Sequence, residues 1–250
     1  SNGQIASVNV LESGTGYLQG STTASIEPTG SGAVFNSNLQ NWRFNLFARN
    51  LEKFTGDDGY ITSGRDGNQY AHLYAPRNLR EVVFSVDQDG SILYGNPDLK
   101  KVSGTEVSST DHSPIIGWAY DGNPIYGPYG YLTKTGGTIA QMKSSYKEEA
   151  STKENRPSLS SFPAGFFIED YTFVKVTDET FLDENNGRFC ITPEYPNGTY
   201  AYFATVNDST SDTSGSFSGF RRPVFPYLIG ENYKSVPNPF NFTNNSNQDS

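Results

Sequence analysis

The clearest pattern of hydrophobic and polar positions lies in the middle of the chain, between residues 111 and 131. Residues 115–120 are mostly β-branched or aromatic, which favours an extended strand, and a second apolar segment begins at Ile125-Tyr126. Between them, Asp121-Gly122 is typical of the positive-φ positions of a tight hairpin turn. Gly127-Pro128 interrupts the second segment, so the pattern predicts two strands joined by a turn and bounded by prolines.

Other apolar segments predict further strands. Residues 42–46 alternate between apolar and polar side chains with period two, as a half-buried strand does, so we expect residues 38–51 to enter the main sheet. Tight turns are expected where Gly and Asp cluster, as at residues 56–60. Shorter apolar runs predict strands at residues 70–76, 81–86, 166–176 and 225–229.

Helical structure is expected at two places. Residues 141–155 carry charges of both signs, which suits a helix surface, although the apolar stripe of an amphipathic helix is almost absent. One helical turn is expected at residues 78–80. Three polar segments without periodicity predict loops, at residues 94–110, 156–164 and 207–218.

The two ends of the chain differ from its middle. Residues 1–36 are rich in glycine, and their alternating apolar positions predict two short strands joined by glycine-rich turns. Residues 37–240 are expected to form one large β-rich domain with short helices and long loops. The Asn-rich tail, residues 241–250, is expected to be ordered only where a neighbour holds it. The missing initiator Met suggests a piece of a longer chain.

Two segments carry a resemblance to a known family. Residues 121–128, Asp-Gly-Asn-Pro-Ile-Tyr-Gly-Pro, resemble the DG-PIYGP signature of the YHYH domain family, and residues 182–203 resemble a second family segment in the same order. Agreement at residues 57–60, 163–171 and 225–227 extends the resemblance over residues 37–245. The family-motif residues are Asp121, Gly122, Pro124, Ile125, Tyr126, Gly127, Pro128, Asp183, Glu184, Asn186, Gly187, Arg188, Tyr200, Ala201, Tyr202 and Phe203.

The chain departs from the family at its name-giving tetrad. The family has Tyr-His-Tyr-His after Gly-Thr, whereas this chain has Tyr200-Ala201-Tyr202-Phe203 after Gly198-Thr199. Both histidines of the tetrad are absent. Imidazole chemistry of the family therefore cannot use these two positions, and the departure favours a scaffold.

Composition and charge exclude several classes of function. The 16 Tyr, 17 Phe, 25 Gly and 14 Pro are typical of many short strands joined by tight turns, which predicts a mainly β fold. The net charge of −9 and the scattered 18 Lys and Arg argue against nucleic acid as a partner. No apolar stretch is long enough to predict a membrane span, and the polar N-terminus does not resemble a signal peptide.

The candidate nucleophiles and bases are few. The single cysteine, Cys190, lies between Phe189 and Ile191 and is expected to pack in the core. His72 and His112 are the only histidines, and neither has the spacing of a metal ligand or of a nucleophile's base. Asp111-His112-Ser113 has the letters of a catalytic triad, but a triad is spatial and not sequential. We therefore expect no catalytic residue, with His72 half-buried as a packing residue.

Carboxylates are the remaining candidates for chemistry. Asp57, Asp58, Asp170 and Asp183 could converge on a calcium or magnesium ion, although none follows a fixed-spacing calcium loop and turn capping explains each. We expect no cofactor, with calcium as the alternative. Asp183 or Glu184 could pair with Asp170 across a sugar ring, as glycosidase carboxylates do. Exposed Tyr and Trp could stack on sugars, yet a β core needs most of the aromatic residues.

The resemblance implies a function through shape and contact. Degenerate domains of this kind next to glycine-rich segments are similar to virion structural proteins of marine cyanobacterial tailed phages. The chain is therefore expected to be a non-enzymatic virion protein, part of the tail, the baseplate or a surface decoration of the extracellular particle. Its expected partners are other virion proteins in a symmetric oligomer, and a host-surface glycan during host attachment. The alternative is a divalent-metal-dependent enzyme or a carbohydrate-binding protein on the same fold.

Overall fold

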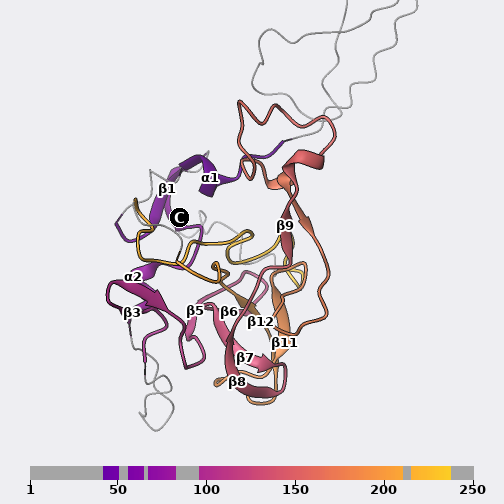
Figure 1. Cartoon of the computed structure of the whole chain (residues 1–250). Helices are drawn as coiled ribbons and strands as arrows, with labels where there is room; N and C mark the ends of the chain where they lie inside the picture. Colours follow the sequence, from indigo (N-terminus) through magenta and orange to yellow (C-terminus); the bar gives the residue numbers. More distant parts are fainter. Residues whose placement is uncertain (1–41, 51–55, 65–66, 83–95, 211–214, 238–250) are drawn as a thin grey trace, which may run out of the picture.

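The computed structural model describes residues 42–50, 56–64, 67–82, 96–210 and 215–237. The glycine-rich segment, the Asn-rich tail and most of the strand expected at residues 81–86 lie outside these ranges. Of that strand, Glu81 and Val82 are described and are not extended into a sheet. The described part is mainly β, as the sequence predicts, with short strands and helices of at most a few residues (Figure 1).

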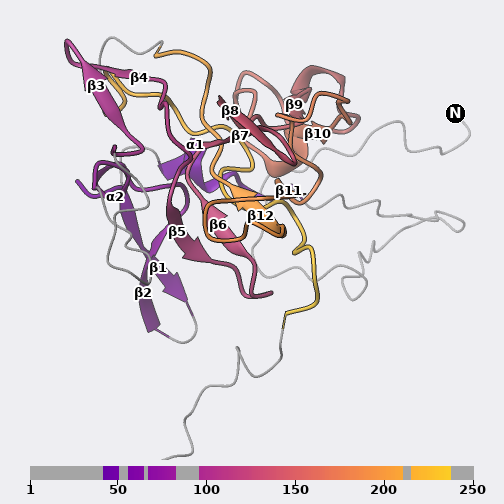
Figure 2. The same cartoon turned by 90° about the horizontal axis from the view of Figure 1, so that it is seen from below.

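A four-stranded sheet occupies the centre of the molecule (Figures 1 and 2). Its strands lie in the order β11 (Gly187–Cys190), β12 (Thr199–Phe203), β6 (Pro124–Tyr126) and β5 (Ile115–Trp118). Strands β12 and β6 are parallel, and the two outer pairs are antiparallel. A parallel pair needs a long crossover, and here the chain between residues 126 and 199 supplies it.

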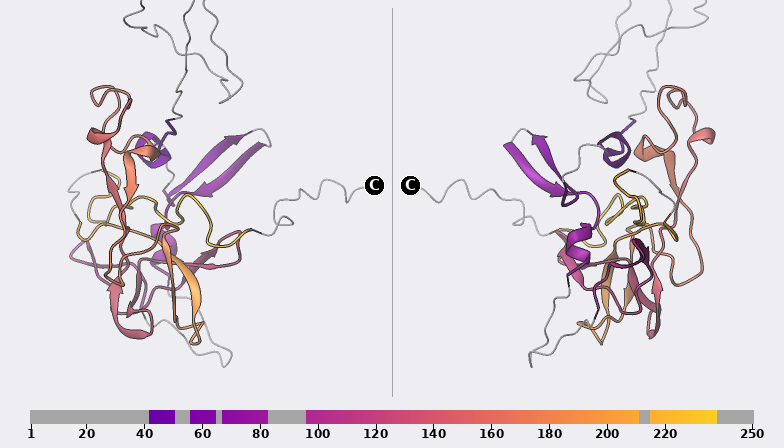
Figure 3. Two further views of the ribbon diagram at one scale, coloured as in Figure 1. Left: turned by 90° about the vertical axis from the view of Figure 1, so that its right-hand side faces the viewer. Right: turned by 60° about the vertical axis from the view of Figure 1, so that its left-hand side comes forward.

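Two-stranded antiparallel ladders surround this sheet. Strand β7 (Tyr129–Thr133) pairs with β8 (Gly136–Gln141), and β9 (Tyr146–Glu148) pairs with β10 (Tyr171–Phe173). Two hairpins, β1–β2 (Gly59–Gly64 and Gly67–His72) and β3–β4 (Lys100–Val102 and Thr105–Val107), are the other ladders within the described residues. Figure 3 shows β1–β2 projecting from the rest of the molecule.

The expected central hairpin is confirmed. Strands β5 and β6 are joined by a turn in which Ala119 N–H donates to the Asn123 carbonyl at 2.9 Å and Gly122 N–H donates to Ala119 at 2.9 Å. Gly122 has φ +84°, a conformation that glycine adopts without strain. Asp121 does not share it, contrary to prediction. Its carboxylate instead accepts a hydrogen bond from the Asn123 N–H at 3.2 Å, as in an Asx turn.

The prediction of a helix at residues 141–155 is wrong. Gln141 ends β8, residues 146–148 form β9, and only Ala150–Thr152 make a 3₁₀ turn, η2. The sequence lacks an apolar stripe there, and pairing with β10 satisfies the backbone instead. The helical turn expected at residues 78–80 is confirmed as α2 (Arg77–Arg80), and the turn at residues 56–60 is confirmed as well.

Several predictions of strands and loops are also wrong or only partly confirmed. Residues 46–50 form a short helix, α1 (Leu46–Asn50), and Phe44 makes only an isolated bridge to Phe167. A 3₁₀ turn, η3 (Ile168–Asp170), interrupts the strand expected at residues 166–176 because Asp170 turns inward. Residues 225–228 form a turn in which Tyr227 N–H donates to Val224 at 2.8 Å. The loop expected at residues 94–110 contains the β3–β4 hairpin. The strand expected at residues 70–76 is confirmed only as far as His72.

Three clusters of side chains form the core of the described residues. The first packs on one face of the central sheet, the second lies between α1 and the C-terminal turns, and the third packs on the opposite face of the sheet. Aromatic rings dominate the second cluster. Its buried members are Phe47, Tyr74, Phe217 and Tyr227.

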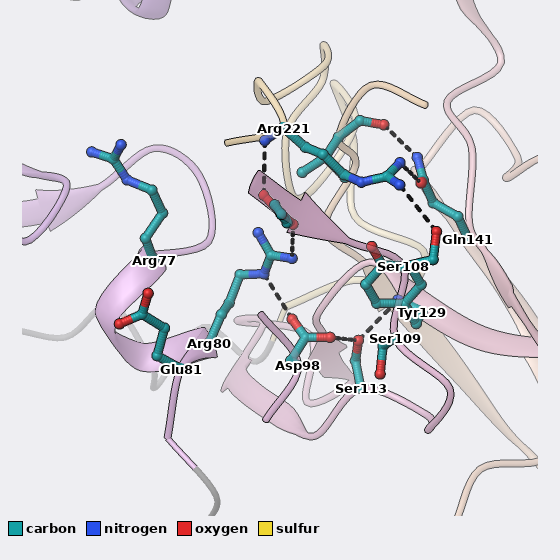
Figure 4. A network of polar contacts seen from close by, with 12 residues as sticks. Arg77, Arg80, Glu81, Asp98, Ser108, Ser109, Ser113, Tyr129, Gln141 and Arg221 are labelled. Atoms are coloured by element: carbon teal, nitrogen blue, oxygen red, sulfur yellow. Dashed lines mark hydrogen bonds and ion pairs between the residues drawn. The ribbon is translucent and has the colours of Figure 1, made fainter. Parts of the chain in front are cut away.

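A buried network of charges joins segments that are distant in sequence (Figure 4). Arg80 on α2 donates to Asp98 at 2.7 Å and to Glu106 on β4 at 2.8 Å. Glu106 also accepts the Arg221 N–H at 2.8 Å, and Asp98 accepts the Ser113 hydroxyl. Arg80, Asp98 and Glu106 are all fully enclosed, at 2%, 2% and 4% exposure. The network therefore fixes α2, β4 and the C-terminal segment to Ser113, in the segment that leads into β5.

Candidate functional site

The family-motif segments meet on the central sheet. Strand β6 of the hairpin lies beside β12, which carries the tetrad positions, and β11 lies on the other side of β12 (Figure 2). The register places Tyr202 beside Ile125 and Ala201 beside Arg188. Because side chains alternate along a strand, the tetrad divides into two pairs that face opposite sides of the sheet.

The first pair consists of the two tyrosines, and each is bound to a motif aspartate. The Tyr202 hydroxyl donates to Asp121 at 2.8 Å, and the Tyr200 hydroxyl donates to Asp183 at 2.8 Å. The two rings meet edge to face with centroids 5.2 Å apart. Burial raises the pKa of both hydroxyls, and the neighbouring carboxylates raise it further. Both tyrosines therefore remain neutral hydrogen-bond donors.

Each aspartate also organises backbone around it. Asp121 accepts the Asn123 side-chain amide at 2.8 Å and the Ser235 N–H at 3.1 Å. Burial alone would raise the pKa of Asp121, but its hydrogen bonds from Tyr202 and Asn123 outweigh burial and lower it. Asp183 accepts the N–H groups of residues 185 and 187 at 3.0 and 3.1 Å. The carboxylates therefore act as turn anchors that the tyrosines lock to the sheet.

The other pair, Ala201 and Phe203, occupies the histidine positions of the tetrad and is completely buried in the first core cluster. The Phe203 ring stacks on Tyr126 with centroids 5.5 Å apart. The Arg188 guanidinium lies 5.6 Å from the Phe203 ring and donates to the Glu179 carbonyl at 2.7 Å. Cys190 lies in the same cluster at 1% exposure, which confirms its expected core role.

His112 also faces this cluster. Its ring lies 5.0 Å from Tyr126 and 6.0 Å from Phe203, measured between centroids. Nδ1 is 2.7 Å from the Ser113 carbonyl, and the buried Nε2 has no hydrogen-bond partner among the described residues. Burial lowers the pKa of His112 to about 4. Ser113 donates to Asp98 and not to His112, so Asp111-His112-Ser113 does not form a triad.

The four candidate metal ligands each have a separate environment. Asp58 is buried and accepts from the Arg77 N–H at 2.7 Å, and Asp170 is held by Arg156 through bonds of 2.6 and 2.7 Å. Burial opposes ionisation of Asp170, but the Arg156 hydrogen bond outweighs it and lowers the pKa. Asp183 is bound to Tyr200, and Asp57 is exposed. The described ranges contain no group of three His, Cys, Asp or Glu arranged to hold a metal ion.

The carboxylate pair considered for a glycosidase includes Asp170, which is bound to Arg156. Both oxygens of Asp170 are engaged by the Arg156 guanidinium, and the Asp170 side chain is fully buried. Such a carboxylate is neither protonated nor accessible, so it can serve neither as a general acid nor as a nucleophile. Glu184 is exposed, and its backbone carbonyl accepts the Tyr146 hydroxyl at 2.7 Å.

The structure also reveals a surface that the sequence did not indicate. A cavity of about 500 Å³ opens between the edge strand β5 and residues 72–79. Trp118, His72 and Asp57 line it. His72 is exposed there, contrary to the expected half-buried position, and its ring contacts Tyr70 edge to face at 5.1 Å. The sequence marks its tryptophans, two in the chain, as possible sugar-stacking residues, but nothing in it indicates that Trp118 is exposed beside a cavity.

One prediction tests the close packing of the motif strands. A Cβ added to Gly187 would lie 2.7 Å from the Ala201 carbonyl oxygen and 2.5 Å from the Tyr200 hydroxyl, whereas at Gly117 the nearest atom would be 3.9 Å away. Gly187→Ala should therefore lower the free energy of unfolding by roughly 1–3 kcal/mol, measured by urea denaturation. Gly117→Ala, in the same sheet, should change it by about 0.5 kcal/mol or less. Equal changes in the free energy of unfolding for the two variants would contradict the close packing of Gly187 against β12.

Comparison with known proteins gives one match. A family model described as YHYH protein matches residues 4–214. The matched range contains the complete motif cluster and begins within the glycine-rich segment. No curated protein and no solved structure matches the chain.

Proposed function

Because this chain belongs to the YHYH protein family, we propose that it is a non-enzymatic structural module of a tailed-phage particle. In the particle it holds neighbouring subunits or contacts the host surface, as part of the tail, the baseplate or a surface decoration. The observation that carries the proposal is the closed state of the motif cluster. Ala201 and Phe203 fill the histidine positions at 0% exposure, and both tetrad tyrosines are bound to aspartates.

Electrostatics support a scaffold in place of a reaction centre. A general acid or base needs access to substrate and a pKa near the working pH. His112 is buried with its pKa lowered to about 4, and Asp58 and Asp170 are each paired with an arginine. The exposed residue His72 lines the cavity beside β5, and neither Asp121 nor Asp183 is among the lining residues of that cavity. The acidic net charge of −9 suits a soluble surface in a particle.

The test is to locate the protein in the particle. Antibodies raised against the purified chain should bind at one recurrent position on intact phage particles in immunogold electron microscopy, and peptides of the chain should appear in digests of gradient-purified particles. Pre-immune serum serves as the control. Particles that contain none of its peptides, or a gene that lies in a cellular genome without phage genes around it, would overturn the proposal.

A further inference from the structure

The cavity beside β5 combines an exposed indole with polar side chains. Trp118, the last residue of β5, is 58% exposed. Across the cavity lie His72 at the end of β2, Asp57 in the preceding turn, and Asn78 on α2. All three are exposed. Figure 2 shows β5 beside β2 and α2, so one wall comes from the central sheet and the other from the projecting hairpin and its neighbouring helix.

The floor of the cavity is apolar and fixed. It includes Ile125, Tyr74 and Ala75, which are buried at 8%, 3% and 6% exposure. Tyr74 belongs to the second core cluster and Ile125 to the third. A floor built from two core clusters does not need to rearrange when a ligand binds, which reduces the entropic cost of binding. The volume of about 500 Å³ suits a small ligand or one unit of a larger one.

The exposed indole is costly without a ligand. No aromatic ring in the described part of the chain packs on Trp118, whereas Trp42 packs on Phe167 and Tyr200 packs on Tyr202. A large aromatic side chain at the rim of a concave surface is typical of a recognition site. A flat ligand face that carries C–H groups would cover the indole and remove it from water.

The opposite wall selects the ligand class. A carboxylate accepts hydrogen bonds, an amide both donates and accepts, and a neutral imidazole does the same through its two nitrogens. Asp57, Asn78 and His72 therefore match a ligand with several hydroxyl groups, each of which donates and accepts. The lining offers a single carboxylate beside an amide and an imidazole, which favours a neutral polyol over a cationic peptide. A pyranose ring has both required faces, C–H groups on one side and hydroxyls at its edge.

We propose that this cavity binds a pyranose unit of a neutral glycan, with the ring stacked on Trp118 and its hydroxyls bonded to Asp57, Asn78 and His72. The inference deepens the host-contact role of the proposed function and rests on it for its biological meaning. The binding chemistry itself belongs to the isolated chain and can be measured without a particle.

The experiment uses the full 250-residue chain. A glycan array should identify a neutral hexopyranose-containing ligand, and calorimetry with that ligand should give the dissociation constant. Trp118→Ala should weaken binding at least tenfold, Trp118→Phe should retain part of it, and Asp57→Asn should weaken it severalfold. Phe189→Ala is the matched control, because Phe189 is 64% exposed but lies outside the cavity lining, and it should bind as the wild type does.

Three results would overturn the inference. They are the absence of any neutral glycan ligand, unchanged affinity in Trp118→Ala with a wild-type melting temperature, and binding of an arginine-containing peptide at the cavity in preference to any sugar. The test of glycan binding and the test of particle location can fail independently of each other. A chain found in particles that binds no glycan leaves the proposed function intact, and a glycan-binding chain absent from particles leaves only the cavity assignment.

Discussion

Replacing Arg80 with methionine is expected to lower the free energy of unfolding by about 3–5 kcal/mol. Arg80 is enclosed between Asp98 and Glu106, at 2.7 and 2.8 Å, so the variant would leave two buried carboxylates without their cation. Burial raises the pKa of Asp98, and Arg80 is the main group that opposes this rise. The attraction of both carboxylates in turn raises the pKa of Arg80 against its own burial.

The matched control is Arg43→Met. Arg43 also pairs with two carboxylates, Glu169 at 2.6 Å and Glu231 at 2.8 Å, but its side chain is 49% exposed. Water screens such a pair, so its loss should cost less than about 1 kcal/mol. For a chain of this length, the Arg80 variant should melt roughly 6–20 °C below the wild type, measured by calorimetry. Similar melting temperatures of the two variants would show that burial does not decide the cost.

A further variant, in which both carboxylates are neutralised, tests whether charge explains the effect of Arg80→Met. Adding Asp98→Asn and Glu106→Gln to the Arg80 variant removes the uncompensated charges while it keeps the shapes of the side chains. The triple variant should recover part of the lost free energy, because a buried neutral amide is far less costly than a buried ion. No recovery would mean that lost packing of the arginine stem, and not charge, explains the effect of Arg80→Met.

The central hairpin was predictable because its signals are local. Asp121-Gly122 between two apolar segments specifies the turn, and Gly122 adopts the positive φ that the pattern predicts. The charge pattern of residues 141–155 predicts a helix, whereas in the structure residues 146–148 pair as a strand with residues 171–173. Such pairing depends on partners that are distant in sequence. Distant partners also decide the conformation of residues 225–228. Phe225 and Tyr227 pack in the second core cluster and form a turn there, not the predicted strand.

The candidate sites show a similar division. The family resemblance identified Tyr200 and Tyr202 as motif residues, but only the register of β12 beside β6 shows that Tyr202 reaches Asp121. The network around Arg80 brings together residues from α2, β4 and the C-terminal segment. No spacing of these residues along the chain predicts the network. The cavity at Trp118 likewise needs two walls from separate elements.

Acidification should unfold the protein partly through His112. In the unfolded chain a histidine has a pKa of about 6.5, whereas burial lowers the pKa of His112 in the folded protein to about 4. Between these values the unfolded state binds a proton that the folded state does not bind. Stability must therefore fall as the pH decreases from about 6.5 to about 4, by about 3 kcal/mol in total, and this contribution is fully present above pH 6.5.

Two variants separate this effect from the titration of carboxylates. His112→Phe should suit the surrounding rings of Tyr126 and Phe203 and should remove the proton uptake, so its free energy of unfolding should fall by about 3 kcal/mol less than that of the wild type between pH 7 and pH 4. His72→Gln changes the only other histidine, which is exposed, and should follow the wild-type curve. The measurement is urea denaturation across this pH range. Parallel curves for the wild type and His112→Phe would show that the His112 imidazole is protonated in the folded protein as readily as in the unfolded chain.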